Sequence, residues 1–446
     1  MSFFSPATIT ALIQSQTDNA AIGTGLIPLL KMTKEKYGTV PAYLEKAVQA
    51  ILPATFGGYP TSADIAPSAV FLAVFIVLTA GHCYVFAKNW SRGHRFYVSL
   101  AVILYGFMNW IGYALRISWA QNMQRVHTGL ASTVLLLCST VLLAGTNLVL
   151  AQRIYTWRHP KIGSSKVFEY GMYFIYFLVL GTIIMGVVSG VVPYLYFLSE
   201  ERFNMCKKVA RAAGLLTVLY SFGAVGLLIL AFVHPPKQKD PNFAVYQPWW
   251  IQSFGICYFV PKGSAKIARD TFVERPDHHK KAVRVIASTT QHYTTVEEIK
   301  TLEEEAAPSL HHNWSILIIC LTTVLLLISS CFRCASLFID KQVYEQTFIF
   351  KPVVLYCTHG LLEFLVLVLY LVTRIDLRFY KPDHLKMGAT TVATTSDDTN
   401  NSNNSSYEKE VDAVSTNRPT EAAVSEAPAA AEEEVNKVGT PVEEKA

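Results

Sequence analysis

The sequence predicts an all-α integral membrane protein: a bundle of seven transmembrane helices followed by a disordered C-terminal tail. Three observations predict this class. Only 16% of the 446 residues are charged and 51% are hydrophobic, whereas a soluble protein carries about 25% charged residues. Seven apolar segments approach the ~20 residues that a helix needs to cross a bilayer. The end of the chain is acidic and of low complexity, so it cannot bury a core.

Residues 1–66 precede the first apolar segment and form the expected N-terminal extracellular or lumenal segment. Their start has neither the basic residues nor the continuous apolar run of a cleaved secretory signal. The stretch "VPAYLEKAVQAIL" predicts one short helix that begins at Pro41, because proline is favoured at a helix start.

Residues 67–382 are expected to form the seven-helix domain. Helices suit lipid because they satisfy every backbone group internally. Tryptophan and tyrosine residues gather near the predicted ends, as in an interfacial belt. The predicted spans lie at about 67–87, 96–115, 128–151, 171–193, 212–233, 314–332 and 352–373.

The distribution of Lys and Arg predicts the orientation. Near the span ends, 14 of these residues lie on one side and 9 on the other. The positive-inside rule then places the N-terminus outside and the C-terminus in the cytosol. It also makes the long 234–313 loop and the disordered 383–446 tail cytosolic. Residues 388–446 hold 12 acidic and 4 basic side chains, which leaves the rest of the chain near +13.

Polar side chains inside a span are costly in lipid and usually face the bundle interior. His359 and Glu363 are four residues apart and therefore share a helix face. They are interpreted either as an ion, proton or substrate position, or as a pair that fixes helix packing by hydrogen bonds, and the packing role is favoured. A metal-dependent hydrolase built on His82, His359 and Glu363 is a third interpretation. The candidate intramembrane polar site comprises His82, Asn109, Asn147, His359 and Glu363.

Charged residues mark several predicted span ends. Arg116 and Arg333 end spans two and six on the predicted outer side, and Arg374, Asp376 and Arg378 close span seven at the cytosolic interface. Arg374 and Arg378 are expected to share a helix face and to meet lipid phosphates there.

The sequence contains no motif of an enzyme or of a cofactor site. It has no phosphate-binding glycine loop, no G-x-S-x-G and no H-E-x-x-H. The CxxC at 331–334 has no second pair, so no metal site is expected. The basic loop lacks the aromatic interleaving of a nucleic-acid surface. We therefore expect a protein that is not an enzyme, has no cofactor or metal, and does not bind nucleic acid.

Three stretches of the domain are distinctive in combination: "NLVLAQRIYTWRHPKIG" (147–163), "CFRCASLF" (331–338) and "EFLVLVLYLVTRIDLRFYKP" (363–382). With them, the chain resembles a group of fungal multi-pass membrane proteins classed as a domain of unknown function. The resemblance covers about 57–382 and implies seven helices, but no reaction and no ligand. The 234–313 loop is longer than in that family, and Trp110 stands where the family tends to have an arginine.

A weaker architectural resemblance runs to the fungal lipid-translocating exporters. It is carried by "YPTSADIAPS" before the first span, by His82, and by "GYALR" (112–116). That family implies the handling of lipids or membrane-active drugs.

Together these features favour a transporter-like or exporter-like protein that handles a lipid or small molecule. Its expected place is the plasma membrane, with an internal membrane as the alternative. The alternative function is a seven-transmembrane receptor or sensor that signals through the cytosolic loop and tail. The expected partners are membrane lipids and cytosolic proteins that bind the 234–313 loop and the 388–446 tail.

Overall fold

The computed structural model describes residues 6–163, 165–234, 256–260, 262–263 and 313–380. Within these ranges the chain is helical with no strand, and an isolated bridge joins Pro53 to Gln342. Seven of the described helices are long and apolar enough to cross a bilayer, which confirms the predicted fold class. The predicted disordered tail and most of the predicted 234–313 loop lie outside the described residues. The orientation in the membrane stays a prediction.

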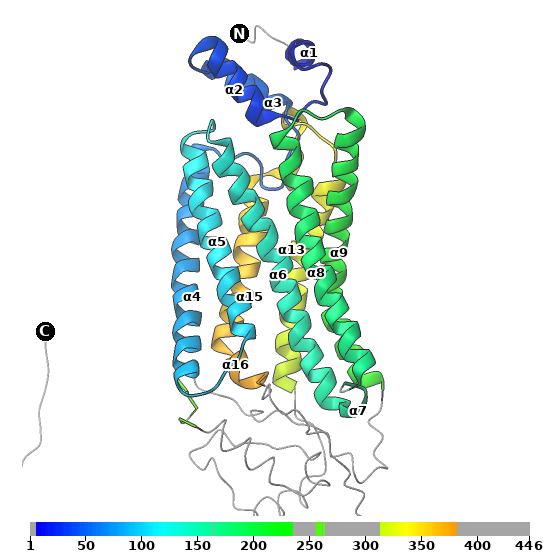
Figure 1. The fold of residues 1–446 in the computed structure, drawn as a ribbon. Helices are drawn as coiled ribbons and strands as arrows, with labels where there is room; N and C mark the ends of the chain where they lie inside the picture. The colour runs from blue at the N-terminus through cyan, green and yellow to red at the C-terminus, as the bar shows by residue number, and fades with distance from the viewer. Residues whose placement is uncertain (1–5, 164, 235–255, 261, 264–312, 381–446) are drawn as a thin grey trace, which may run out of the picture. The chain divides into compact units, whose positions relative to one another are not determined.

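The spans lie side by side in Figure 1, with the N-terminal helices beyond one end and α7 and α16 at the other. The seventh span has three consecutive segments. Short helical segments flank the spans: η1 (Ser62–Asp64) precedes the first, α7 (Pro160–Gly163) joins the third to the fourth, η2 (Val343–Glu345) and η3 (Phe348–Phe350) lie between the sixth and the seventh, and α16 (Ile375–Arg378) follows the seventh. The spans are α4 (Ile65–Ser91), α5 (Val98–Gln121), α6 (Val126–Arg158), α8 (Lys166–Leu195), α9 (Glu200–Val233), α13 (Asn313–Phe338), and α14 (Pro352–Leu355), η4 (Tyr356–Leu362) and α15 (Glu363–Val372) together.

Several helices run past the predicted span ends because their polar ends continue the helix outside the apolar part. Helix α9 begins at Glu200, well before the predicted start at 212. The hydroxyl of Ser199 accepts from the backbone N–H of Arg202, and Glu200 and Glu201 lie in the first turn. Both features stabilise a helix N-terminus.

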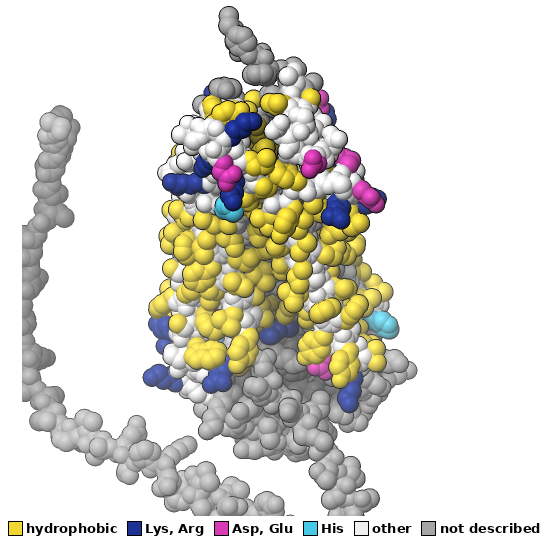
Figure 2. Space-filling model, turned by 45° about the horizontal axis from the view of Figure 1, so that its top comes forward, with side chains coloured by type: hydrophobic (Ala, Val, Ile, Leu, Met, Phe, Trp, Pro, Cys, Tyr) yellow, Lys and Arg dark blue, Asp and Glu magenta, His cyan; other side chains and the backbone are white. Residues whose placement is uncertain are grey.

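Helix α6 is the central helix of the bundle. In its most apolar stretch 72% of the residues are buried, against 22% in α4 and in α8. Figure 2 shows hydrophobic side chains covering the middle of one face, with charged side chains toward its two ends. This is the surface that a bilayer requires of a spanning bundle, because charges are stable only near the headgroups.

Three short helices precede the first span: α1 (Pro6–Gln16), α2 (Leu26–Tyr37) and α3 (Ala42–Ile51). The predicted helix after Pro41 is α3, whereas α1 and α2 were not predicted. Backbone hydrogen bonds attach this segment to the bundle at two places. Ala21 and Gly25 donate to the carbonyls of Leu198 and Pro193 at the end of α8, and Ala54 donates to the carbonyl of Lys341.

Candidate functional site

The seventh span contains a π-helix, η4, at the centre of the bundle. His359 lies within η4, and Glu363 follows directly as the first residue of α15. Gly360 lets η4 pack closely on α4, because a Cβ at this position would lie 2.7 Å from the ring of Phe71. π-Helical turns are rare and are frequently found at functional sites.

The carboxylate of Glu363 is fully buried and accepts from three helices. Its Oε1 lies 2.8 Å from the hydroxyl of Thr140 on α6 and 3.0 Å from that of Ser329 on α13. Its Oε2 accepts from the hydroxyl of Tyr105 on α5 at 3.0 Å. A buried charge in a bundle is tolerated when its lone pairs are satisfied in this way.

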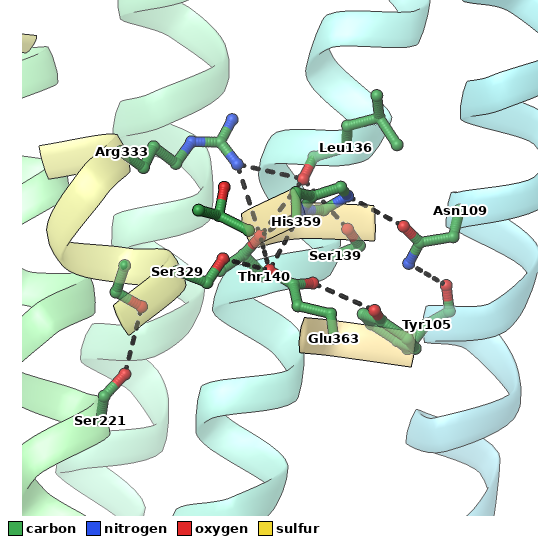
Figure 3. Close-up of polar contacts among 12 residues, drawn as sticks. Tyr105, Asn109, Leu136, Ser139, Thr140, Ser221, Ser329, Arg333, His359 and Glu363 are labelled. Atoms are coloured by element: carbon green, nitrogen blue, oxygen red, sulfur yellow. Dashed lines mark hydrogen bonds and ion pairs between the residues drawn. The ribbon is translucent and has the colours of Figure 1, made fainter. Parts of the chain in front are cut away.

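The imidazole of His359 uses both nitrogens. Its Nδ1 lies 3.0 Å from Oε1 of Glu363, and its Nε2 lies 2.9 Å from Oδ1 of Asn109. The amide of Asn109 donates through Nδ2 to the carbonyl of Tyr105, so its oxygen faces the histidine. Figure 3 shows these side chains converging from neighbouring helices.

Arg333 belongs to this site, although the sequence placed it at an interface. Its Nη1 donates to the carbonyl of Leu136 at 3.2 Å and to the hydroxyl of Thr140 at 3.4 Å (Figure 3). Helix α13 continues to Phe338, so Arg333 lies inside the helix and turns toward α6. We call the following set the central cluster: Tyr105, Asn109, Thr140, Ser329, Arg333, His359 and Glu363.

The other two predicted polar residues lie nearby but have different partners. Asn147 donates to Thr323 at 2.8 Å and accepts from Thr322 at 3.0 Å and from Tyr370 at 3.2 Å. His82 lies 3.2 Å from the carbonyl of Leu367 through Nε2. Both tie a span to its neighbours, and neither contacts the His359–Glu363 pair.

A second buried cluster surrounds Arg116 at the end of the bundle that carries α1–α3. Its Nη2 donates to the carbonyl of Gly57 at 2.7 Å and lies 3.6 Å from Oδ1 of Asp64. Its Nε donates to the hydroxyl of Tyr356, which lies 3.0 Å from the same carboxylate. Gly57 has a φ of 77°, a conformation that favours glycine. Arg116 therefore fixes the approach to the first span and does not face the interface.

A third buried cluster follows the seventh span, and it differs from what we predicted. Arg374 is fully buried and binds both oxygens of Asp376, at 2.9 and 2.8 Å. It also donates to the carbonyls of Ile256 and Tyr258. Asn89 donates to the same carboxylate at 2.6 Å. We call Asn89, His94, Arg374 and Asp376 the α16-end cluster.

The expectation that Arg374 and Arg378 share a helix face and meet lipid phosphates was therefore wrong. Arg374 has a φ of 52°, which ends the span and starts the separate turn α16. Both side chains point into the protein, and Nε of Arg378 donates to the carbonyl of Thr373 at 2.8 Å. Arg374 is held inside the protein because Asp376 accepts two charge-assisted hydrogen bonds from its guanidinium group and two backbone carbonyls accept further ones.

Two groups of the α16-end cluster have shifted pKa values. Burial lowers the pKa of His94 from its ordinary 6.5, opposed in part by the hydrogen bond to the carbonyl of Asp376. Burial alone would raise the pKa of Asp376, but the bonds from Arg374 outweigh it and bring the pKa below its ordinary 3.8. At neutral pH, Asp376 is thus ionised and His94 is neutral.

The sequence did not identify Tyr105, Thr140 or Ser329 as members of the central cluster. Hydroxyl side chains occur in every span and normally bond their own helix backbone, so they give no signal by themselves. The third interpretation, a hydrolase site, required His82 to join His359 and Glu363. The structure does not bring His82 to the pair, and the described residues contain no group of His, Cys, Asp and Glu that could hold a metal ion.

Comparison with known proteins gives a family of unknown function. Residues 160–380 match the family described as "Protein of unknown function (DUF3112)". The matched part includes Ser329, Arg333, His359 and Glu363, whereas Asn109 and Thr140 precede it. No curated protein and no solved structure matches the chain. The chain is thus a multi-pass membrane protein of unknown function that is similar to the DUF3112 family over residues 160–380.

Proposed function

We propose that the protein is a transporter-like or exporter-like protein that handles a lipid or small molecule at the plasma membrane. In this proposal the His359–Glu363 pair takes up and releases a proton during the cycle. The observation that supports it most strongly is the burial of an ionisable pair where a π-helix meets an α-helix in the middle of a span. Ionisable groups at membrane depth usually mark the path of a substrate, an ion or a proton.

The hydrogen-bond geometry supports a bound proton. Oδ1 of Asn109 accepts, so Nε2 of His359 must donate. A neutral imidazole has only one donor, which leaves Nδ1 without a hydrogen. Nδ1 lies 3.0 Å from Oε1 of Glu363 and 3.2 Å from the hydroxyl of Thr140. In this proposal one further proton, on either the imidazole or the carboxyl group, bridges Nδ1 and Oε1 in one state of the cycle, and the hydroxyl of Thr140 can donate to Nδ1 in the other.

Loss of that proton would place two acceptors against each other. The pair would then separate, or Asn109 would turn its amide. Thr140 on α6 and Ser329 on α13 donate to the same carboxylate oxygen, and Tyr105 on α5 donates to the other. Movement of Glu363 would therefore break hydrogen bonds to three helices. Arg333 fixes a positive charge beside Thr140, and Tyr105 faces Oε2 from α5. These contacts support coupling between proton binding and the packing of the seventh span.

The test compares Glu363→Gln with Glu345→Gln, a matched change at an exposed residue of η2. Growth of cells lacking the protein is first profiled across lipids, azoles, ions and pH to find a sensitivity. We expect that Glu363→Gln reproduces that sensitivity at a normal surface level, because glutamine keeps the size but cannot exchange the proton. Glu345→Gln should behave as wild type. Normal growth of a well-expressed Glu363→Gln strain would contradict the proposal.

The receptor alternative rests on the 234–313 loop and on the 388–446 tail. Most of the loop and all of the tail lie outside the described residues, and no contact within the bundle favours signalling over transport. We therefore carry the lipid- or small-molecule-handling function forward.

A further inference from the structure

A large apolar chamber lies between the N-terminal helices and the end of the bundle. Its volume is about 380 Å³, and α1, α2 and α3 form its walls. Trp119 and Met123, at the end of α5 and in the turn to α6, line its other side together with Tyr59. Binding sites for small molecules occupy about 300–1,000 Å³ and are mostly apolar. Ordinary protein interiors contain few voids larger than a water molecule.

The helices around the chamber do not pack against one another as a closed core does. Helix α2 has no buried residue, although its sequence LIPLLKMTKEKY is apolar on the side that lines the chamber. Leu29 and Leu30 are only partly buried. Leu44 and Val48 of α3 and Ile13 of α1 face the same space and are also partly buried. An apolar guest in the chamber would complete the burial of these side chains, which is favourable in proportion to the area removed from water.

Hydrogen bonds nevertheless attach the helices around the chamber to the bundle. Thr24 and Gly25, just before α2, are hydrogen-bonded to Leu198 and Pro193. After α3, the chain pairs with residues 341–343 through Ala54 and Leu52. Tyr59 lies edge-on to Trp119, with ring centroids 5.6 Å apart. Both ends of the helical segment are therefore attached, and the space between them is part of the fold.

The surroundings indicate an amphiphile. Trp119 lies in the last turn of α5 and Met123 follows that span, so the chamber lies where the second span ends, beside the membrane surface. Its polar lining includes Lys36, Glu45 and Gln124, and Gln124 donates to the carboxylate of Glu45 at 3.3 Å. Lys36 is exposed and forms no ion pair within 4 Å among the described residues. A head with negative charge would find a cation there.

We propose that this chamber binds an amphiphilic lipid, with its apolar chain between α1, α2 and α3 and an anionic head near Lys36. This inference deepens the proposed function and rests on it for the role of the lipid. Binding itself is a separate property, because the chamber contains no member of the central cluster.

The test uses the purified full-length protein in detergent and a photoactivatable palmitic acid, with crosslinked residues mapped by mass spectrometry. We expect labels within residues 12–52 and at Trp119 that unlabelled palmitic acid removes. Labels confined to the lipid-facing surface of α8, around Phe177, would overturn the proposal. Labels at the outer surface of α2 only would overturn it as well.

Two occluding variants sharpen the result. Leu29→Trp and Leu44→Phe fill the chamber, and each should weaken competable labelling by about tenfold, equivalent to about 1.4 kcal/mol. Leu180→Trp is the matched control, because Leu180 is exposed on α8. Unchanged labelling in a folded occluding variant would contradict the proposal, and the wild-type map decides it if both variants fail to fold.

The two proposals can fail separately. Labelling of the chamber together with normal growth of the Glu363→Gln strain would reject the proposed function and keep the lipid site. A growth defect in that strain without labelling of the chamber would reject the lipid site and keep the proposed function.

Discussion

Two buried acid–base pairs lie along the end of the chain, and they differ in one chemical respect. His359 and Glu363 meet in the middle of the seventh span, and Arg374 and Asp376 meet just after it. Each of these four side chains is at most 5% exposed. An arginine in a protein is always charged, whereas a histidine changes charge near neutral pH. Burial is therefore common to both pairs, but only the first contains a residue type whose unperturbed pKa lies near neutral pH.

This difference separates a structural role from a candidate functional role. Arg374 binds Asp376 and two carbonyls of the 256–260 segment, so it joins the end of the span to a distant part of the chain. Because arginine stays charged over the physiological pH range, its ion pair with Asp376 is not expected to change in that range. The central cluster instead connects α5, α6 and α13 through one carboxylate whose partner is titratable.

The largest expected effect comes from Asp376→Asn. The change leaves the charge of the buried Arg374 without its carboxylate, and removal of one partner of a buried pair costs about 3–5 kcal/mol. The free energy of unfolding in detergent, from denaturant titration, measures this loss. Glu363→Gln is the comparison, with an expected loss of about 1–3 kcal/mol, because the amide oxygen of glutamine can still accept from Thr140 and Ser329. A larger loss of unfolding free energy for Glu363→Gln than for Asp376→Asn would contradict the assignment of the structural role to the Arg374–Asp376 pair.

A smaller effect is expected from pH through His94. The folded state holds the pKa of His94 below 6.5, so the unfolded chain binds more protons at acidic pH. Stability is thus full above pH 6.5 and falls as the pH drops below it, by at most about 1.4 kcal/mol per pH unit. His94→Gln keeps a donor for the carbonyl of Asp376 and should reduce this slope. The slope is measured by denaturant titrations at a series of pH values between about 5 and 7, where histidine changes charge.

The slope that remains in His94→Gln sharpens the comparison further. Asp376 titrates below its ordinary 3.8 and does not contribute in this window. A remaining slope that disappears in the double variant with Glu363→Gln would assign it to the central cluster. An unchanged slope in His94→Gln itself would show that His94 does not control acid stability.

The smallest expected effect is that of Ser329→Ala. It removes one of the hydrogen bonds to Glu363, and a hydrogen bond between helices in a membrane is worth about 0.6 kcal/mol. The unfolding free energy in detergent again measures the change. Ser336→Ala is the control, because its hydroxyl bonds only the carbonyl of Arg333 on its own helix. A loss for Ser329→Ala that equals that of Glu363→Gln would mean that the cluster acts as one unit.

The predicted spans and the outcome differ mainly at the ends of the helices. All seven predicted segments lie in helices that are long and apolar enough to cross a bilayer, because length and hydropathy can be read from the sequence directly. Helices α9 and α13 extend beyond the predicted spans, since polar residues continue a helix past its apolar part. Helices α1 and α2 escaped prediction because short segments without strong periodicity give little signal.

The candidate site was predicted in part. Asn109, His359 and Glu363 were identified from their polarity within apolar runs, and the structure brings these three together. Arg333 was assigned to the interface because it lay near an assumed span end. Asp64 stands before the first span in the sequence and gave no sign that it would lie beside Arg116.

The sequence by itself determined the number of spans, their approximate positions and the presence of costly polar residues within them. These follow from the requirement that a chain in lipid be apolar over about 20 helical residues. Only the tertiary structure decided which polar groups meet. The rotation of each helix and the inward turn at Arg374 are set by contacts between residues far apart in the chain, such as Tyr105 with Glu363 and Arg374 with Ile256. The local sequence does not identify those distant partners, because each hydroxyl or charged group could be paired with several others until the packing of the helices selects one.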